Sequence, residues 1–221
     1  MRRHRELAEQ VVTVVGGTTG VGRAVALGAA GRRARVTVAG ADARALDRLA
    51  AEADVPHRFE TLTIDPGRSD AAERVSAAAT ARFGLLHTWV HVLGRGGGDG
   101  ASVRDVAVHA MGQLRRSGGG AFVVVAPEPG LATRDASGPR LSAELAALDA
   151  LVRERRDLSS VTLVRRTGAV PPERVADAVL RAAVRPRSEI VVHGSARRDA
   201  LVARLVPSPG RVLGPLGAVG R

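Results

Sequence analysis

Residues Val11 to Gly22, VVTVVGGTTGVG, carry the clearest structural pattern in this 221-residue chain. Its first part, Val11 to Val15, is a β-branched apolar run bounded by glycine, which predicts a strand buried on both faces. A glycine-rich turn follows, and the next residues, RAVALGAAG, have the spacing and composition of a helix. Such a turn lets the backbone approach a phosphate, and the helix directs its free N–H groups and positive dipole end toward that anion. The stretch therefore predicts the phosphate-binding start of a dinucleotide fold.

The overall composition is that of one globular domain. Hydrophobic residues make up 45% of the chain, which is enough for one sizeable core. No apolar run reaches the length of about 18 residues that a membrane span needs. We expect a single domain over residues 1–206 and a loose tail rich in proline and glycine over residues 207–221. The charged start MRRHRELAEQ lacks the apolar segment of a secretory signal, so a cytoplasmic location is expected.

Neither a metal site nor a specific nucleic-acid site is expected. The chain has no cysteine, and its six histidines are scattered without a carboxylate cluster around them. The net charge is +11, but all 33 basic residues are arginine and are spread along the chain. Aromatic residues make up only 2%, too few for platforms on which bases could stack. Weak, non-specific attraction to polyanions is the expectation that remains.

Strand-like and helix-like segments alternate along the whole chain. Strands are expected over residues 11–15, 34–39, 57–64, 85–93, 121–126, 161–164 and 190–192. Helices are expected from residue 20 onward and over residues 42–53, 69–81 (with Ser69 as N-cap), 103–116, 141–156, 172–184 and 196–206. This order predicts an α/β fold of the Rossmann type, a doubly wound, seven-stranded parallel sheet with helices on both faces in three layers.

The glycine turn resembles the signature of the short-chain dehydrogenase/reductase family. The spacing Gly16-x-x-x-Gly20-x-Gly22 is similar to the family's T-G-x-x-x-G-[IV]-G, with Val15 where the family usually has threonine. IDPGRSD, from Ile64, resembles the family's D-V-[TS]-D segment, and RRSGGGAFVVV resembles the start of its central strand. PPERVADAVLRAAVRPRSEIVV resembles its C-terminal helix and last strand. The resemblance covers nearly the whole chain and implies an NAD(P)-binding Rossmann domain that forms homodimers or homotetramers.

The family resemblance also implies which residues contact the dinucleotide. These are Gly16, Thr18, Thr19, Gly20, Val21, Gly22, Asp42, Asp65, Pro66 and Gly94. Asp65 would hydrogen-bond the adenine ring, with Pro66 beside it. The choice between NAD and NADP stays open, because Gly40 and Ala41 stand where an acid or an arginine would read the ribose 2′ position. Asp42 follows one or two residues late.

The departures from the family concern its chemistry. Members use an Asn-Ser-Tyr-Lys tetrad, but this sequence contains no tyrosine, no lysine and no asparagine. Alignment of the segments APEPG and RLSAE puts Pro127 at the serine position, Arg140 at the tyrosine position and Glu144 at the lysine position. A guanidinium stays charged at neutral pH and donates no proton. A helix ion pair between Arg140 and Glu144 is therefore favoured over a catalytic role.

His91 is the candidate for a substituted acid or base. The family's N-N-A-G segment, which floors the cofactor pocket, is His91-Val92-Leu93-Gly94 in this chain. His91 is expected at the carboxyl end of a strand, where α/β sheets bind ligands. The alternative, a histidine packed or hydrogen-bonded at a strand end, is the favoured interpretation. His87, on the same face of that strand, is expected to be structural.

Two functions from different classes follow from these observations. The first is a short-chain dehydrogenase/reductase-like protein that keeps a dinucleotide site, has lost hydride transfer, and serves as a non-catalytic, regulatory or scaffold homologue. The alternative is an atypical NAD(P)-dependent oxidoreductase, or a non-redox isomerase, dehydratase or cyclase, that uses a substituted acid or base such as His91. An interaction protein that binds no nucleotide is a third class, because the pocket floor differs from that of the family.

Overall fold

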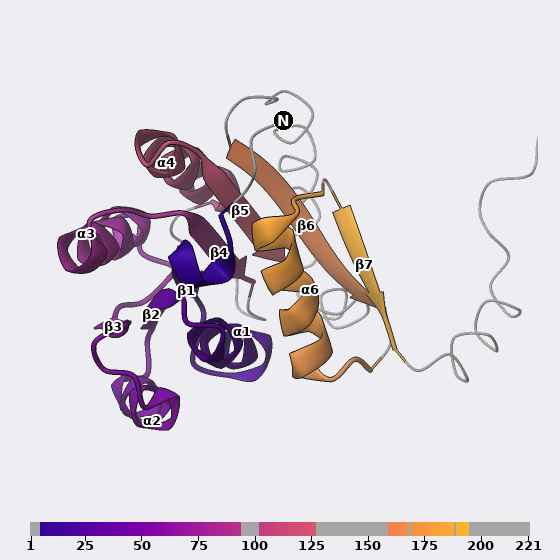
Figure 1. Ribbon diagram of the computed structural model, residues 1–221, viewed down its shortest axis with the longest axis horizontal. Coiled ribbons are helices and arrows are strands. Elements are labelled where there is room, and N and C mark those ends of the chain that lie inside the picture. The colour runs from indigo at the N-terminus through magenta and orange to yellow at the C-terminus, as the bar shows by residue number, and fades with distance from the viewer. Residues whose placement is uncertain (1–4, 94–101, 127–158, 168, 188, 195–221) are drawn as a thin grey trace, which may run out of the picture.

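Seven parallel strands form one sheet with helices packed on both of its faces (Figure 1). The computed structural model describes residues 5–93, 102–126, 159–167, 169–187 and 189–194. Within these residues the strand order is β3-β2-β1-β4-β5-β6-β7, so the direction of winding changes between β1 and β4. The predicted α/β fold of the Rossmann type is therefore confirmed.

The elements follow the expected alternation. The strands are β1 (Val11–Val15), β2 (Arg35–Gly40), β3 (Phe59–Thr63), β4 (Thr88–Val92), β5 (Gly120–Val125), β6 (Ser159–Thr167) and β7 (Glu189–His193). The helices are the short 3₁₀ helix η1 (Leu7–Glu9), α1 (Gly20–Gly31), α2 (Ala43–Ala53), α3 (Ala71–Phe83), α4 (Val103–Arg116) and α6 (Pro172–Val184). The bounds of α4 and α6 are those expected from the sequence. The expected helices over residues 141–156 and 196–206 and the expected tail lie outside the described residues.

The expected N-cap of α3 is wrong. The helix begins at Ala71, and its N-cap is Asp70 rather than Ser69. Ser69 lies inside a turn closed by the Ala71 N–H, which donates to the carbonyl of Arg68 at 3.1 Å. The Asp70 carboxylate is held by Arg68, at 2.8 Å from Nε and 3.1 Å from Nη2. The ion pair and the turn together delay the start of the helix.

The two faces of the sheet bury separate apolar cores. Val12 and Val14 of β1 pack on the face covered by α1, α2 and α6, whereas Val15 packs on the face covered by α3 and α4 (Figure 1). Trp89 of β4 and Phe122 of β5 are fully buried on the α3–α4 side. β1 is buried along its whole length, as expected for a central strand of a parallel sheet.

Candidate functional site

The turn between β1 and α1 lies at the carboxyl edge of the sheet, where the direction of winding changes. The N–H groups of Gly16 and Gly17 donate to the carbonyl of Ala39 on β2, at 3.0 and 3.3 Å. Gly16 has a φ of +78°, and a Cβ there would lie 2.8 Å from the carbonyl oxygen of Val92 on β4. The turn is thus fixed between β2 and β4, at the position where open parallel sheets bind ligands.

The first turn of α1 packs directly on the glycine turn because Gly22 has no side chain. A Cβ at Gly22 would lie 2.1 Å from the carbonyl oxygen of Gly16 and 2.8 Å from the Cα of Gly17. Both are backbone atoms, so the helix could accommodate a side chain only by moving away from the turn. Gly22 therefore sets how close the helix N–H groups lie to the glycine turn.

We expect Gly22→Ala to lower the free energy of unfolding by about 3 kcal/mol, because backbone rather than a flexible side chain has to move. Gly31→Ala in the same helix is the matched control, since nothing lies within 4 Å of the added Cβ. In a helix, alanine is more stable than glycine by up to about 1 kcal/mol, so the control variant is expected to keep or gain stability. Urea denaturation measures the difference between the variants, and equal stability of the two would contradict the close packing at Gly22.

The N-terminal end of α1 carries no side-chain cap. Its N-cap, Thr19, is extended (φ −141°, ψ 162°), and its hydroxyl accepts no bond from the first turn of the helix. Thr19 and Gly20 are exposed, whereas Val21 is buried in the core on the α1 side of the sheet. Among the described residues, no side chain accepts the first N–H groups of α1, and the positive end of the helix dipole faces the surface beside the glycine turn. This arrangement suits an anion such as a pyrophosphate.

The carboxyl ends of β2 and β3 meet beside the glycine turn. The Ile64 N–H donates to the carbonyl of Gly40 at 2.9 Å, which holds the two strand ends together. Thr18 of the glycine turn packs against Gly40, where a Cβ would lie 2.6 Å from the Thr18 Cγ2 atom. The contact leaves no room for a side chain at Gly40. An acidic residue or an arginine that contacts a ribose 2′ group could therefore not replace Gly40 without displacing Thr18.

Two of the sequence-predicted carboxylates lie at these strand ends. Asp42 follows β2 and accepts the Ala45 N–H at 3.0 Å, which caps α2. Asp65 follows β3 and accepts the Gly67 N–H at 2.9 Å, with the half-buried Pro66 between them. Both aspartates are exposed. Each has one oxygen fixed by a local backbone bond, and the strand that precedes each aspartate ends at the edge of the sheet that carries the glycine turn.

The likeness of this chain to known proteins lies in its fold. No protein-family model matches it, and no curated protein matches it. Among solved structures it is similar to a Brucella melitensis short-chain dehydrogenase/reductase described as a glucose/ribitol dehydrogenase, with a TM-score of 0.70 and 21% identity over 88% of this chain and 98% of that one. A 7α-hydroxysteroid dehydrogenase in complex with NADH and 7-oxo glycochenodeoxycholic acid has a TM-score of 0.71 and 14% identity, over 87% of this chain and 95% of that one. A metagenomic short-chain oxidoreductase in complex with NADP has a TM-score of 0.64 and 20% identity, over 86% of this chain and 99% of that one. The chain has the fold of the short-chain dehydrogenases/reductases.

Within this short-chain dehydrogenase/reductase fold, His91 is the one sequence-predicted catalytic candidate that falls in the described residues. Arg140, Glu144 and the cofactor-floor residue Gly94 lie outside them. His91 is 8% exposed at the carboxyl end of β4, and its Nδ1 has no hydrogen-bond partner in the described part of the chain. Burial lowers the pKa of His91 from 6.5 to about 4, so the imidazole is neutral at neutral pH.

His87, the residue directly before β4, is structural, as expected. Its Nδ1 accepts the N–H of Val11 at 2.9 Å, which joins the beginnings of β4 and β1. Burial, with the positive charges of Arg5 and Arg35 nearby, lowers the pKa of His87 from 6.5 to about 4. His87 and His91 are therefore both neutral side chains of the fold at neutral pH.

The described residues hold neither a metal-type cluster nor a membrane span. In them, no group of three or more histidines, cysteines, aspartates or glutamates is placed to hold a metal ion. Across the same residues, no helix is long and apolar enough to cross a membrane.

Proposed function

We propose that this protein binds NAD(H) or NADP(H) at the glycine turn and serves as a non-catalytic, regulatory or scaffold homologue of the short-chain dehydrogenases/reductases. The observation that carries the proposal is the uncapped N-terminus of α1, which Gly22 lets pack directly on the Gly16 turn. Backbone N–H groups and the helix dipole there would hold the pyrophosphate. Two of the similar structures contain NADH and NADP, which supports this choice of ligand.

The neighbouring strand ends supply the remaining contacts. Asp65 and Pro66, after β3, would flank the adenine ring, as the family resemblance implies. Asp42, after β2, keeps one carboxylate oxygen for a ribose hydroxyl while the other caps α2. Gly94 would floor the site by the same resemblance.

The composition of the chain supports a non-catalytic role. Without tyrosine, lysine or asparagine, three members of the family's tetrad have no counterpart at any position. His91 does not replace them readily, because a pKa of about 4 leaves it protonated in about one molecule in a thousand at neutral pH. A group that is so rarely charged is a poor general acid.

One observation favours the second candidate function, an atypical oxidoreductase or a non-redox isomerase, dehydratase or cyclase. The Nδ1 of His91 is buried without a partner at the ligand-binding edge of the sheet. An unsatisfied buried nitrogen costs stability, and a substrate hydroxyl or carbonyl would supply the missing bond. In that function His91 would move a proton at Nδ1.

The test is a titration of the full chain with NADH and NADPH, followed by quenching of Trp89, the only tryptophan. Trp89 lies two residues before His91 on β4 and is fully buried. We expect saturable quenching and a rise in the free energy of unfolding of about 2.7 kcal/mol at a hundredfold excess over Kd. The absence of both signals from folded protein would overturn the proposed binding. Turnover of carbonyl or alcohol substrates that His91→Gln removes while the quenching persists would replace the non-catalytic function by the second one.

A further inference from the structure

The beginnings of β1, β2 and β4 meet at the amino edge of the sheet, opposite the edge that carries the glycine turn. His87, directly before β4, is fixed there by both backbone groups of Val11. Its N–H donates to the Val11 carbonyl at 3.0 Å, and its Nδ1 accepts the Val11 N–H at 2.9 Å. Arg35, the first residue of β2, is the register partner of Val11 on the other side of β1. His87 and Arg35 therefore flank the same residue of the central strand.

The hydrogen bond from Val11 decides which nitrogen of the His87 ring carries the proton. A neutral imidazole accepts at one nitrogen and donates at the other, so the accepting Nδ1 leaves the proton on Nε2. His87 is 5% exposed, and its Nε2 is buried with no hydrogen-bond partner in the described part of the chain. Because a buried donor without an acceptor costs stability, this position favours a ligand that supplies an acceptor.

The buried side chain of Gln10 ties Arg5 to the same place. Its Nε2 donates to the Arg5 carbonyl at 2.7 Å. Its Oε1 accepts the hydroxyl of Thr88, the residue directly after His87, at 2.6 Å. The positive charges of Arg5 and Arg35 both act on His87 and contribute to its lowered pKa. Two guanidiniums and one N–H donor thus gather at the amino edge, and we call His87, Arg5 and Arg35 the amino-edge site.

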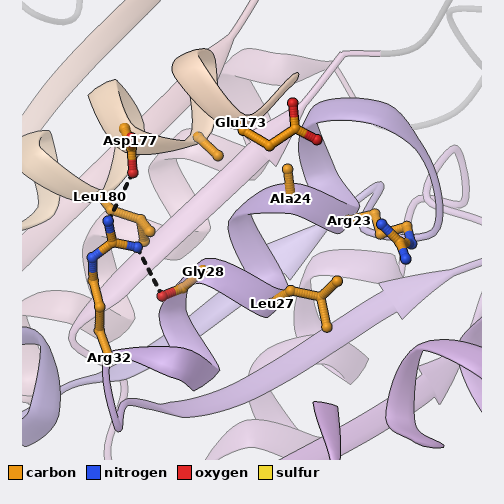
Figure 2. A pocket seen from close by; sticks show the side chains of 9 residues that line it. Arg23, Ala24, Leu27, Gly28, Arg32, Glu173, Asp177 and Leu180 are labelled. Atoms are coloured by element: carbon orange, nitrogen blue, oxygen red, sulfur yellow. Dashed lines mark hydrogen bonds and ion pairs between the residues drawn. The ribbon is translucent and has the colours of Figure 1, made fainter. Parts of the chain in front are cut away.

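No carboxylate neutralises either guanidinium of the amino-edge site. Arg5 is exposed and Arg35 half-buried, and neither side chain has a hydrogen bond or an ion pair with any residue that the structure describes. Arg32, three residues before Arg35, shows the contrast. It is held by Asp177 at 2.7 Å and donates to the carbonyl of Gly28 at 3.0 Å, as the dashed lines in Figure 2 show. Arg5 and Arg35 keep their full capacity to bind an anion.

The charged side chains of the neighbouring segments leave a positive excess at this edge. The carboxylates of these segments are Glu6, Glu9, Asp54 and Glu60. Their arginines, besides Arg5 and Arg35, are Arg33, Arg58 and Arg82. Glu60 is already paired with Arg82 at 3.5 Å. None of the four carboxylates is among the charges that act on His87, so the field at this side chain is that of Arg5 and Arg35.

We propose that the amino-edge site binds a phosphate-type oxyanion, with the Nε2–H of His87 donating to one oxygen and Arg5 and Arg35 pairing with the others. A phosphate group combines several acceptor oxygens with up to two negative charges near neutral pH, which matches one neutral donor and two guanidiniums. Nε2 has no contact with solvent, so binding requires the side chains that cover it to move, and the unpaired Arg5 and Arg35 are free to do so. The site lies at the opposite edge from the glycine turn, and this inference does not rest on the proposed dinucleotide function.

The test follows the Nε2–H signal of His87 by NMR while the full chain is titrated with inorganic phosphate, and with chloride at the same ionic strength as the reference. The signal is assigned by its absence from His87→Asn, whose side-chain oxygen can still accept the Val11 N–H. We expect a saturable shift with phosphate and none with chloride. Acetate, which carries a single charge, is expected to bind at least about fivefold more weakly than phosphate.

Arg5→Gln combined with Arg35→Gln is expected to weaken phosphate binding by about tenfold or more, because both cations are lost. The matched control is Arg74→Gln combined with Arg104→Gln, the same charge change at exposed positions in the first turns of α3 and α4. The control and Thr19→Glu, both at the opposite edge of the sheet, are expected to change phosphate binding by less than about twofold.

Four results would overturn the proposal. Without a shift of the Nε2–H signal, phosphate does not bind at His87. An equal loss in both double variants would show attraction to net charge alone. Loss of phosphate binding in Thr19→Glu would place the anion at the N-terminus of α1, in the proposed dinucleotide site. Acetate that binds as tightly as phosphate would show that the site does not select the doubly charged oxyanion.

Discussion

Replacing Thr19 by glutamate is expected to weaken the binding of NADH and NADPH by at least about fivefold without destabilising the fold. Thr19 is exposed, extended and makes no side-chain cap bond, so a longer side chain fits there without strain. Its carboxylate would stand at the N-terminus of α1, where the pyrophosphate is proposed to bind. The variant therefore tests the site with little risk of unfolding the protein.

The size of the effect follows from the charges. Two unit charges about 4 Å apart repel by about 1 kcal/mol in water and by about 4 kcal/mol near a protein surface. Each 1.4 kcal/mol is about tenfold in affinity, so the expected loss lies between roughly fivefold and several hundredfold. The same carboxylate interacts favourably with the helix dipole, by about 0.3 to 1 kcal/mol. Affinity and stability are thus expected to change in opposite directions, which a merely disruptive substitution does not produce.

The control for this variant is Thr19→Gln, which has the same shape without the charge. Titration by tryptophan quenching gives the affinity of each variant, and urea denaturation without ligand gives its stability. We expect the glutamine variant to bind within about threefold of the wild type, since it adds no charge. Equal affinities of the glutamate and glutamine variants would place the dinucleotide away from the α1 N-terminus and contradict the proposed site.

The sequence predicts the layers of this fold well because burial leaves a periodic pattern in each element. The bounds of β1, α4 and α6 follow directly from runs of apolar residues at strand or helix spacing. The start of β4 does not follow from its apolar run. The apolar run begins at Leu85, yet the strand begins at Thr88, because the Leu86 N–H donates to the hydroxyl of Ser117 at 3.1 Å instead of to a neighbouring strand. Hydropathy does not show which partner a backbone group finds.

The same limit applies to the candidate site. The glycine turn could be predicted because its backbone needs glycine at defined spacings. The carbonyl of Val92 above Gly16, and the packing of Thr18 on Gly40, involve backbone atoms and segments far apart in the chain. The residue types in the sequence do not indicate that such contacts form. The lowered pKa of His91 likewise depends on the strands beside it, since burial is its cause.

We expect the protein to lose stability as the pH falls from 6.5 toward 4. In the folded chain the pKa values of His87 and His91 are about 4, whereas in the unfolded chain both return to 6.5. Between these values the unfolded chain binds protons that the folded chain does not, so unfolding takes up protons and becomes easier as the pH falls. Above pH 6.5 both histidines are neutral in the folded and in the unfolded chain, so they add no pH dependence to the free energy of unfolding. Over the full window each histidine accounts for roughly 3 kcal/mol.

Urea denaturation at several values between about pH 4.5 and 7.5 measures this dependence above the range in which most carboxylates titrate. His91→Asn keeps a polar side chain but cannot take up a proton, so its stability is expected to fall less steeply with decreasing pH than that of the wild type, while His87 and His109, whose pKa values burial also lowers, keep contributing. His57→Asn, at an exposed position before β3, is the control and is expected to keep the full slope. A wild-type stability that is flat across this range would show that the pKa of His91 in the folded state stays near 6.5, so that a substantial fraction of the side chain is protonated near neutral pH. A protonated His91 at the ligand-binding edge of the sheet could act as a general acid. That result would favour the second candidate function, the atypical enzyme, over the non-catalytic one.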